Sequence, residues 1–133
     1  MKKYVFIIFL FSAVLTGCFG NAGSGELEST CTKVIDSQVL KETDTYIISY
    51  KEGNIKNTIL KKEYTGMDIS ASLKTYQKTY ESSNGVDINI ENNTFTATFD
   101  ISNVDDEIMN TCNLKKTYNE QVKTLKDLGF TCE

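Results

Sequence analysis

The most regular pattern in the chain is an alternation of apolar and polar residues from Val86 to Ile101, interrupted by Asn92-Asn93. Successive side chains of a strand point to opposite faces, so this pattern predicts a hairpin with a two-residue turn. One face pairs Val86 with Phe99, Ile88 with Ala97 and Ile90 with Phe95. The other face pairs Asp87 with Thr98, Asn89 with Thr96 and Glu91 with Thr94. A slip of one residue would mix the two faces, so the pattern also fixes the register.

A second hairpin is predicted upstream, where the alternation is less regular. Tyr46, Ile48 and Tyr50 alternate, the turn residues 51–54 follow, and residues 55–64 return with apolar side chains on both faces. Segment 31–40 is either an additional strand or the extended start of this hairpin. Its few apolar residues do not distinguish the two.

Two amphipathic helices are predicted from apolar residues at helical spacing. The first begins at the N-cap residue Asp68 and ends at Asn84-Gly85. The second begins where Thr117 and Glu120 have the spacing of a capping box, and it ends at Gly129. The apolar stripes are Ile69, Leu73, Tyr76 and Tyr80 in the first helix, and Tyr118, Val122, Leu125 and Leu128 in the second.

The order of these elements is strand, strand, helix, strand, strand, helix. We therefore expect a two-layer α+β domain, with an antiparallel sheet of two hairpins and the helices packed on one face. A short helical turn over residues 104–111, capped by Asn103, is an optional addition to this ββαββα arrangement.

The N-terminus has the pattern of a bacterial lipoprotein signal. Lys2 and Lys3 precede a nearly continuous apolar run of 12 residues, which ends in the lipobox Leu15-Thr16-Gly17-Cys18. The run is too short to cross a bilayer as a helix, which takes about 20 residues. We therefore assign residues 1–17 to a signal peptide, 18–30 to a lipidated cysteine and flexible tether, and 31–133 to one folded domain.

Lipidation of Cys18 would fix where the protein resides. A diacylglyceryl group with fatty acyl chains such as palmitate anchors a protein durably, since each buried methylene contributes about 0.8 kcal/mol. The expected location is the cell membrane, with the domain facing outward into the cell envelope.

Charge and composition exclude several functions. The formal charge is −4 and falls to −6 when Lys2 and Lys3 leave with the signal peptide, so nucleic acid is not an expected partner. The chain contains no His, Arg, Trp or Pro. Without His it lacks the usual general base and the commonest ligand of transition metals. We therefore assign no catalytic residue, metal site or cofactor.

Three cysteines remain after Cys18 is lipidated, and outside the cytoplasm two of them can pair. A bond between Cys31 and Cys132 would join the two ends of the folded segment and is favoured by position. Cys112 with Cys132 and Cys31 with Cys112 remain as alternatives. The unpaired thiol is interpreted as a small buried apolar group.

Two groups of residues could suggest binding sites but have simpler interpretations. The acidic cluster Asp100, Asp105, Asp106 and Glu107 lacks the glycine and glutamate spacing of a calcium-binding EF-hand, so we interpret it as acids at a helix start. The tyrosines of the domain are interpreted as core or rim packing. They are Tyr46, Tyr50, Tyr64, Tyr76, Tyr80 and Tyr118.

The chain resembles the small YehR-like lipoproteins, a domain family of unknown function. The resemblance covers most of the mature chain and rests on the lipobox, Cys31-Thr32, the hairpin segment 46–55, and the terminal Gly129-Phe130-Thr131-Cys132. It implies the same localisation and fold and no established enzymatic activity. Cys112 has no assigned place in that pattern.

Two functions are compatible with these features. The first is a non-enzymatic binding or interaction module, which contacts an envelope protein, peptide or glycan through an exposed strand or through side chains. The alternative is a small lipoprotein that captures a solute for a transporter. Binding proteins of transporters usually have two lobes around a cleft, and the mature chain is short for that architecture.

Overall fold

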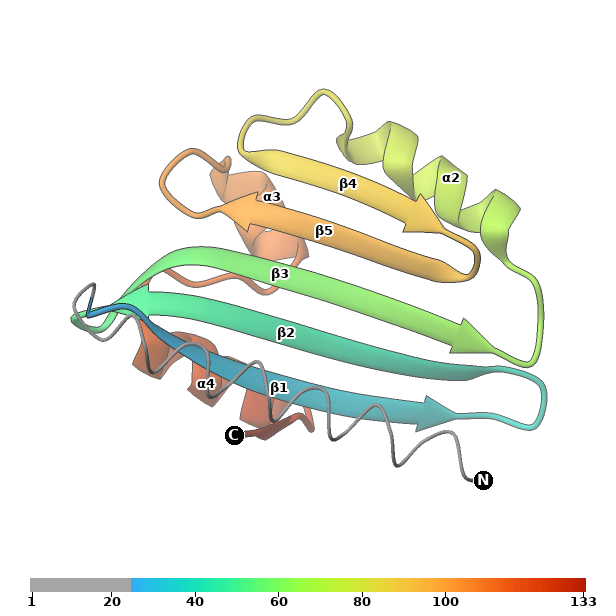
Figure 1. The fold of residues 1–133 in the computed structure, drawn as a ribbon, viewed down its shortest axis with the longest axis horizontal. Helices are drawn as coiled ribbons and strands as arrows, with labels where there is room; N and C mark the ends of the chain where they lie inside the picture. Colours follow the sequence, from blue (N-terminus) through green and yellow to red (C-terminus); the bar gives the residue numbers. More distant parts are fainter. Residues whose placement is uncertain (1–24) are drawn as a thin grey trace.

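A computed structural model of the protein describes residues 25–133. Its centre is a six-stranded antiparallel sheet with the order β4-β5-β3-β2-β1-β6 (Figure 1). The strands are β1 (Leu27–Asp36), β2 (Lys41–Lys51), β3 (Asn54–Thr65), β4 (Val86–Glu91), β5 (Thr94–Asp100) and β6 (Thr131–Cys132). The helices are α2 (Ser70–Tyr80), α3 (Asp106–Thr111) and α4 (Tyr118–Asp127).

The predicted ββαββα arrangement of two hairpins is wrong, although the α+β class is confirmed. Two further strands, β1 and β6, complete the sheet, and α3 is added between β5 and α4. β1 starts at Leu27, so four residues assigned to the tether belong to the sheet. β1 could not be predicted with certainty, because its apolar residues do not alternate so as to define a buried face. Ser29 and Cys31 are buried, whereas Val34 and Ile35 are exposed.

Both predicted hairpins are present. In β4–β5 every predicted pair is confirmed, from Val86 with Phe99 to Ile90 with Phe95. β2 and β3 are joined by Glu52-Gly53, and both residues have positive φ (53° and 79°). Positive φ at both central positions is the geometry of a type I′ turn, which matches the twist of the strands it joins.

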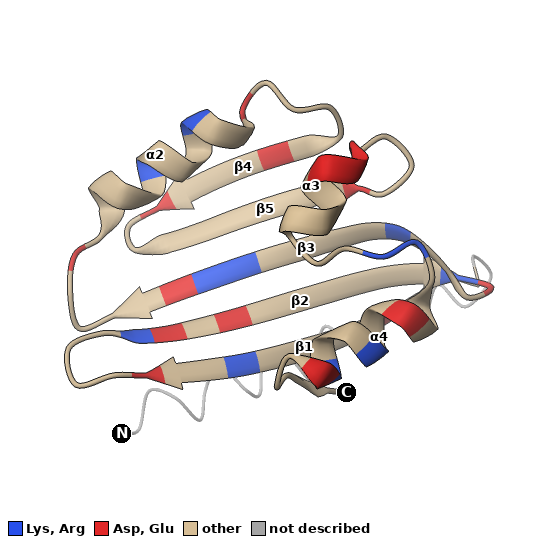
Figure 2. Ribbon diagram, turned by 180° about the vertical axis from the view of Figure 1, so that it is seen from behind, with Lys and Arg blue, Asp and Glu red and all other residues tan. Residues whose placement is uncertain are grey.

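The three helices of residues 25–133 lie on one face of the sheet (Figure 2). Thr117 is the N-cap of α4 as predicted, but its hydroxyl bonds to the Glu120 carboxylate (2.9 Å). The N-cap of α2 is Ile69, and Asp68 accepts a hydrogen bond from the Ser70 N–H instead. The predicted Asn103 cap of the short helix is wrong, because α3 begins after Asp105.

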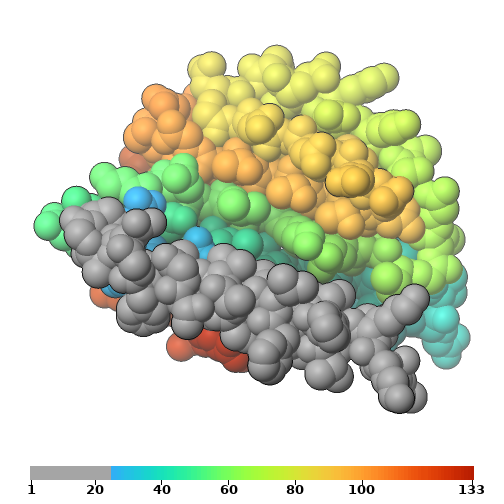
Figure 3. All heavy atoms as spheres, viewed as in Figure 1, coloured from blue at the N-terminus to red at the C-terminus, as the bar shows by residue number. Residues whose placement is uncertain are grey.

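The core lies between the sheet and these helices. Its most enclosed apolar side chains come from β2, β5, α2, α4 and the α3–α4 loop. They are Ile48, Phe99, Leu73, Leu125 and Leu114. Figure 3 shows the other face of the sheet, which is turned away from the core. No helix of residues 25–133 covers the parts of β3, β4 and β5 that are visible there. That face carries the threonines that the hairpin pattern placed on the polar side.

A disulfide joins Cys31 to Cys132, which confirms the pairing favoured by position. The two cysteines are direct partners in the ladder between β1 and β6. Cys112 is free. Within residues 25–133, no helix is long and apolar enough to cross a membrane. Cys18 and the signal peptide lie outside the described residues.

Candidate functional site

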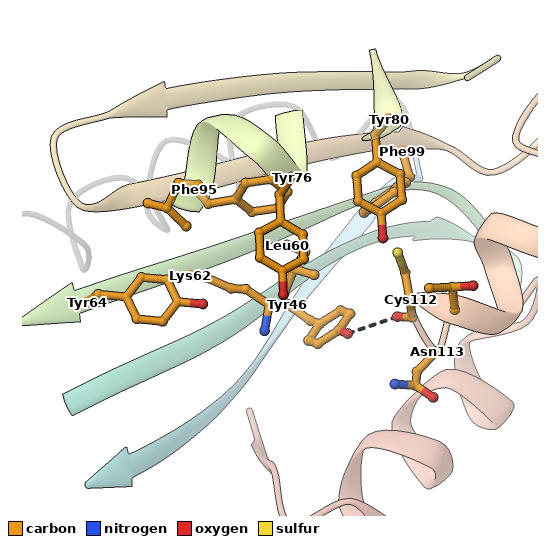
Figure 4. A pocket seen from close by; sticks show the side chains of 12 residues that line it. Tyr46, Leu60, Lys62, Tyr64, Tyr76, Tyr80, Phe95, Phe99, Cys112 and Asn113 are labelled. Atoms are coloured by element: carbon orange, nitrogen blue, oxygen red, sulfur yellow. Dashed lines mark hydrogen bonds between the residues drawn. The ribbon is translucent and has the colours of Figure 1, made fainter. Parts of the chain in front are cut away.

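The helix side of the sheet contains a pocket of about 190 Å³ between α2, the end of α3, and strands β2, β3 and β5 (Figure 4). We call it the aromatic pocket because six of its lining residues are Tyr46, Tyr64, Tyr76, Tyr80, Phe95 and Phe99. The other lining residues are Leu60, Lys62, Leu73, Thr111, Cys112 and Asn113. A cavity of about 150 Å³ can hold benzene, so this volume suits a ring or a short chain.

The local structure of each element explains this lining. Alternate residues of a strand share a face, so Leu60, Lys62 and Tyr64 of β3 all point to the helix side. On α2, Tyr76 and Tyr80 are four residues apart and therefore share one side of the helix. Tyr76 forms the rim of the pocket, with 57% of its surface exposed.

Tyr46 ties the sheet to the end of α3. Its hydroxyl donates a hydrogen bond to the Cys112 carbonyl (2.9 Å), and its ring meets that of Phe130 edge to face. Burial, followed by the nearby Cys112, raises the pKa of Tyr46 to about 12. The phenol therefore stays protonated and keeps donating at physiological pH.

A cluster of charges lies beside the pocket, which we call the charge cluster: Glu42, Asp44 and Lys62. The Lys62 ammonium is 3.1 Å from a Glu42 oxygen and 3.3 Å from an Asp44 oxygen. Figure 2 shows acidic positions on β2 beside a basic stretch of β3. Burial opposes the charge of Lys62, but the two carboxylates outweigh it and raise its pKa. Lys62 is therefore a permanent cation.

The two carboxylates of the charge cluster have different acidities. Burial, followed by the Glu42 carboxylate, raises the pKa of Asp44 to about 6, against a lowering by Lys62. Burial also acts to raise the pKa of Glu42, but hydrogen bonds and the charge of Lys62 lower it overall. Asp44 is therefore the member of the cluster that changes charge just below neutral pH.

Cys112 contributes a half-buried thiol to the pocket wall, so it is less enclosed than the buried apolar group expected of the unpaired cysteine. Figure 4 shows the Tyr80 hydroxyl directed toward this sulfur. Burial raises the pKa of the Cys112 thiol despite the opposing effects of Tyr80 and Lys62. The reactive thiolate form is therefore disfavoured at neutral pH.

The structure gives the acidic cluster of the sequence a structural role. Asp105 is the N-cap of α3, and Asp106 and Glu107 lie in its first turn. Asp100 accepts hydrogen bonds from Ser102 and Asn103, which organise the turn after β5 and lower the pKa of Asp100. Among the described residues, no group of His, Cys, Asp and Glu side chains is arranged to hold a metal ion.

Sequence reasoning missed the site that the fold assembles. The interpretation of the tyrosines as core or rim packing holds for Tyr50 and Tyr118, whose rings stack at 3.9 Å, and for Tyr46, which is buried in the core. It does not anticipate that four tyrosines, Tyr46 among them, line one pocket. A signal was present in the strands, because Asp44 is two residues from the core residue Tyr46 and Lys62 is two residues from the core residue Leu60, so each occupies an inward position. A charged residue at an inward position is costly unless it is paired or functional.

Comparisons with known proteins do not assign a family. No family model matches the chain, and no curated protein matches it. The NMR structure of a protein from Streptococcus pneumoniae TIGR4 is similar over 81% of this chain and 85% of that chain. The identity is 14% and the TM-score 0.46, values too low to support a functional argument. Membership of the YehR-like family therefore stays a prediction.

Proposed function

We propose that this protein is a membrane-anchored bacterial lipoprotein that acts as a non-enzymatic binding module in the cell envelope. The lipobox supports the anchor, and the aromatic pocket supports the binding role. In this proposal a ligand or a partner side chain enters the pocket from the rim at Tyr76.

The observation that carries the binding role is the composition of the pocket wall. Six aromatic rings adjoin a paired charge cluster, and small-molecule sites typically combine an apolar lining with a few convergent polar groups. Other surfaces are less specific. The hollow on the opposite face is lined by polar residues alone, including Lys61, Asn89 and Thr96. The edge strand β4 has a neighbouring strand on one side only, so its free edge offers backbone groups and no side-chain specificity.

The chemistry of the pocket favours binding over turnover. The pKa values of Tyr46 and Tyr64 are raised to about 12, in each case with burial as the largest cause. Together with the raised pKa of Cys112, this leaves the hydroxyls and the thiol as hydrogen-bond donors rather than nucleophiles. Asp44 titrates near neutral pH, but its carboxylate is engaged by Lys62.

A second candidate is the capture of a small solute for a transporter. The size of the pocket favours it, because about 190 Å³ accommodates a small molecule and not a folded partner. In that case the lipid anchor would keep the loaded domain near a membrane complex.

The test is to isolate the full-length protein from its own membranes and to identify bound species by native mass spectrometry. Tyr76→Ala removes the exposed ring at the rim, and Thr96→Ala changes the opposite face as a matched control. We expect a bound species that is lost from the Tyr76 variant and kept by the control. Species bound equally to all three proteins would contradict the role of the pocket. Catalytic conversion of the bound species would contradict the non-enzymatic role.

A further inference from the structure

The charge cluster is short of positive charge. It contains two carboxylates and one ammonium, so its net charge is −1 when all three groups are ionised. Only 7% of the Asp44 surface is exposed, and its Oδ1 accepts no hydrogen bond from an N–H donor among residues 25–133, although the Glu42 carboxyl lies within hydrogen-bonding reach of the Asp44 side chain. A buried carboxylate oxygen without a donor is unfavourable, and such groups in native structures call for an explanation. The cluster can therefore accept one more cationic donor.

Two lysines on neighbouring strand positions form other contacts. Lys33 lies directly opposite Asp44 on β1, but its ammonium donates to the Leu128 carbonyl (2.7 Å). Lys61 precedes Lys62 on β3 and belongs to the opposite face, where it pairs with Glu63 (2.9 Å). Neither lysine therefore completes the charge cluster.

The aromatic pocket and the charge cluster are contiguous, because Lys62 belongs to both. Tyr64 also links them, since its ring lines the pocket and its hydroxyl is 3.4 Å from a Glu42 oxygen. The faces of aromatic rings attract cations, most strongly where water is excluded. Aromatic rings next to an excess of negative charge can bind an organic cation, because the rings and the carboxylates both attract positive charge.

We propose that the aromatic pocket binds an organic ammonium group, with its carbon body against the rings and its charge at the Lys62 end of the pocket, which the carboxylates of Glu42 and Asp44 adjoin. This inference rests on the proposed function and names its ligand class. The bound ammonium offsets the excess negative charge of the cluster. An anion would have to compete with both carboxylates for Lys62, so a cation is the better complement.

The volume of the pocket limits the ligand to the size of a side chain. Such an ammonium group can belong to a free amine or to a lysine of a peptide. Free phenethylammonium combines one ring with one ammonium. The capped peptide acetyl-Gly-Lys-Gly-amide presents an ammonium on a peptide backbone.

The titration of Asp44 gives the inference a pH signature. The groups facing Asp44 are Glu42 and Tyr46 on its own strand, Lys62 and Tyr64 on β3, and Lys33 on β1. Because the pKa of Asp44 is raised to about 6, its carboxylate is mostly ionised at pH 8 and mostly protonated at pH 5. Binding of a cation favours the ionised form, so affinity falls on acidification and binding releases protons near pH 6.

The experiment measures calorimetric binding to the full-length protein in an uncharged detergent. Three probes keep the ring and change the charge: phenethylammonium, 2-phenylethanol and 3-phenylpropanoate. At pH 8 we expect phenethylammonium to bind about tenfold or more tightly than the alcohol, and the carboxylate most weakly. At pH 5 the advantage of the ammonium over the alcohol should shrink.

Variants separate charge recognition from the pocket itself. Asp44→Asn should weaken phenethylammonium about tenfold and leave 2-phenylethanol unchanged. Glu42→Gln, at a more exposed carboxylate, provides a second charge variant if Asp44→Asn fails to fold by circular dichroism. Tyr76→Ala should weaken the ammonium and the alcohol together, whereas Thr96→Ala on the opposite face should weaken neither.

The outcomes distinguish the ligand class from the proposed function. Equal binding of ammonium and alcohol, or tightest binding of the carboxylate, would overturn the cation inference while supporting the pocket as a binding site. If Tyr76→Ala changes the binding of none of the three probes, the aromatic pocket is not their binding site, and the proposed function is contradicted as well. Preference for the lysine peptide over phenethylammonium would support the inference with a peptide as the source, and the reverse order would support it with a free amine.

Discussion

Cys31 and Cys132 are direct partners in the ladder between β1 and β6, and a disulfide joins their side chains. The bond links residues 101 positions apart. The bond also holds the two-residue strand β6 against β1. The other edge of β1 is paired with β2. Around the bond, Thr30 and Glu133 exchange two backbone hydrogen bonds (3.0 and 2.8 Å). The disulfide therefore fixes the short edge strand β6 to the rest of the sheet.

Reduction of this disulfide, or Cys132→Ser, should destabilise the protein. A cross-link over a loop of about 100 residues contributes up to roughly 4.7 kcal/mol by restricting the unfolded chain. We expect a clear fall in the free energy of unfolding, measured with urea, and a smaller change for the control Cys112→Ser. Equal unfolding midpoints for oxidised and reduced protein would contradict this prediction.

Phe99→Ala should cost roughly 3–5 kcal/mol, because Phe99 is 1% exposed in the core. Thr96→Ala lies on the same strand but on the opposite face, and it should change stability by less than about 1 kcal/mol. Urea unfolding of both variants measures the contrast. Similar losses at the two positions would show that both faces of the hairpin are packed equally.

Gln121→Leu should destabilise the loop between α3 and α4. The fully buried Gln121 amide donates to the Asn113 carbonyl and accepts from the Lys115 N–H, both at 2.8 Å. Leucine has a similar volume but leaves both backbone groups unpaired, which should cost roughly 2–4 kcal/mol. Lys123→Ala, at an exposed position on the same helix, serves as the control in thermal unfolding. A loss no larger than that of the control would indicate that the loop is held by other contacts.

Asp44→Asn should change how stability depends on pH. The pKa of Asp44 is about 6 in the folded protein and ordinarily 3.8, so the folded chain retains a proton that the unfolded chain releases between about pH 4 and 6. This group therefore lowers stability as the pH rises through that window, by up to about 3 kcal/mol. The variant should gain stability relative to the original protein from pH 4 to pH 8, measured by urea unfolding. A constant difference across that range would argue against the raised pKa.

Cys18 should carry lipid, because it ends the lipobox Leu15-Thr16-Gly17-Cys18. Mass spectrometry of the membrane-extracted protein should find an N-terminal cysteine with a diacylglyceryl group. Cys18→Ser should prevent the modification and release or mislocalise the protein. An intact leader, or cleavage at another residue, would contradict the proposed anchor.

Much of the local structure could be predicted from the sequence because it depends on residues close together in the chain. The register from Val86 to Ile101 is a property of strict alternation around Asn92-Asn93. The start of α4 at Thr117 likewise follows a local sequence signal, the spacing of Thr117 and Glu120, although their side chains bond to each other and not to the helix backbone. The disulfide between Cys31 and Cys132 was favoured by position alone, since cysteines at both ends of a domain can close it.

Only the tertiary structure decided the sheet and the site. β1 has no apolar alternation, and its role depends on pairing with β2 and with β6, whose residues lie about 100 positions away. The aromatic pocket is assembled from β2, β3, β5, α2 and the end of α3, so no single segment contains its pattern. Asp44 is paired on one side only, because strand pairing places Lys62 beside it, whereas the Lys33 ammonium donates to the distant Leu128 carbonyl. Burial and charge pairing between distant segments are properties of the folded chain, and local patterns do not encode them.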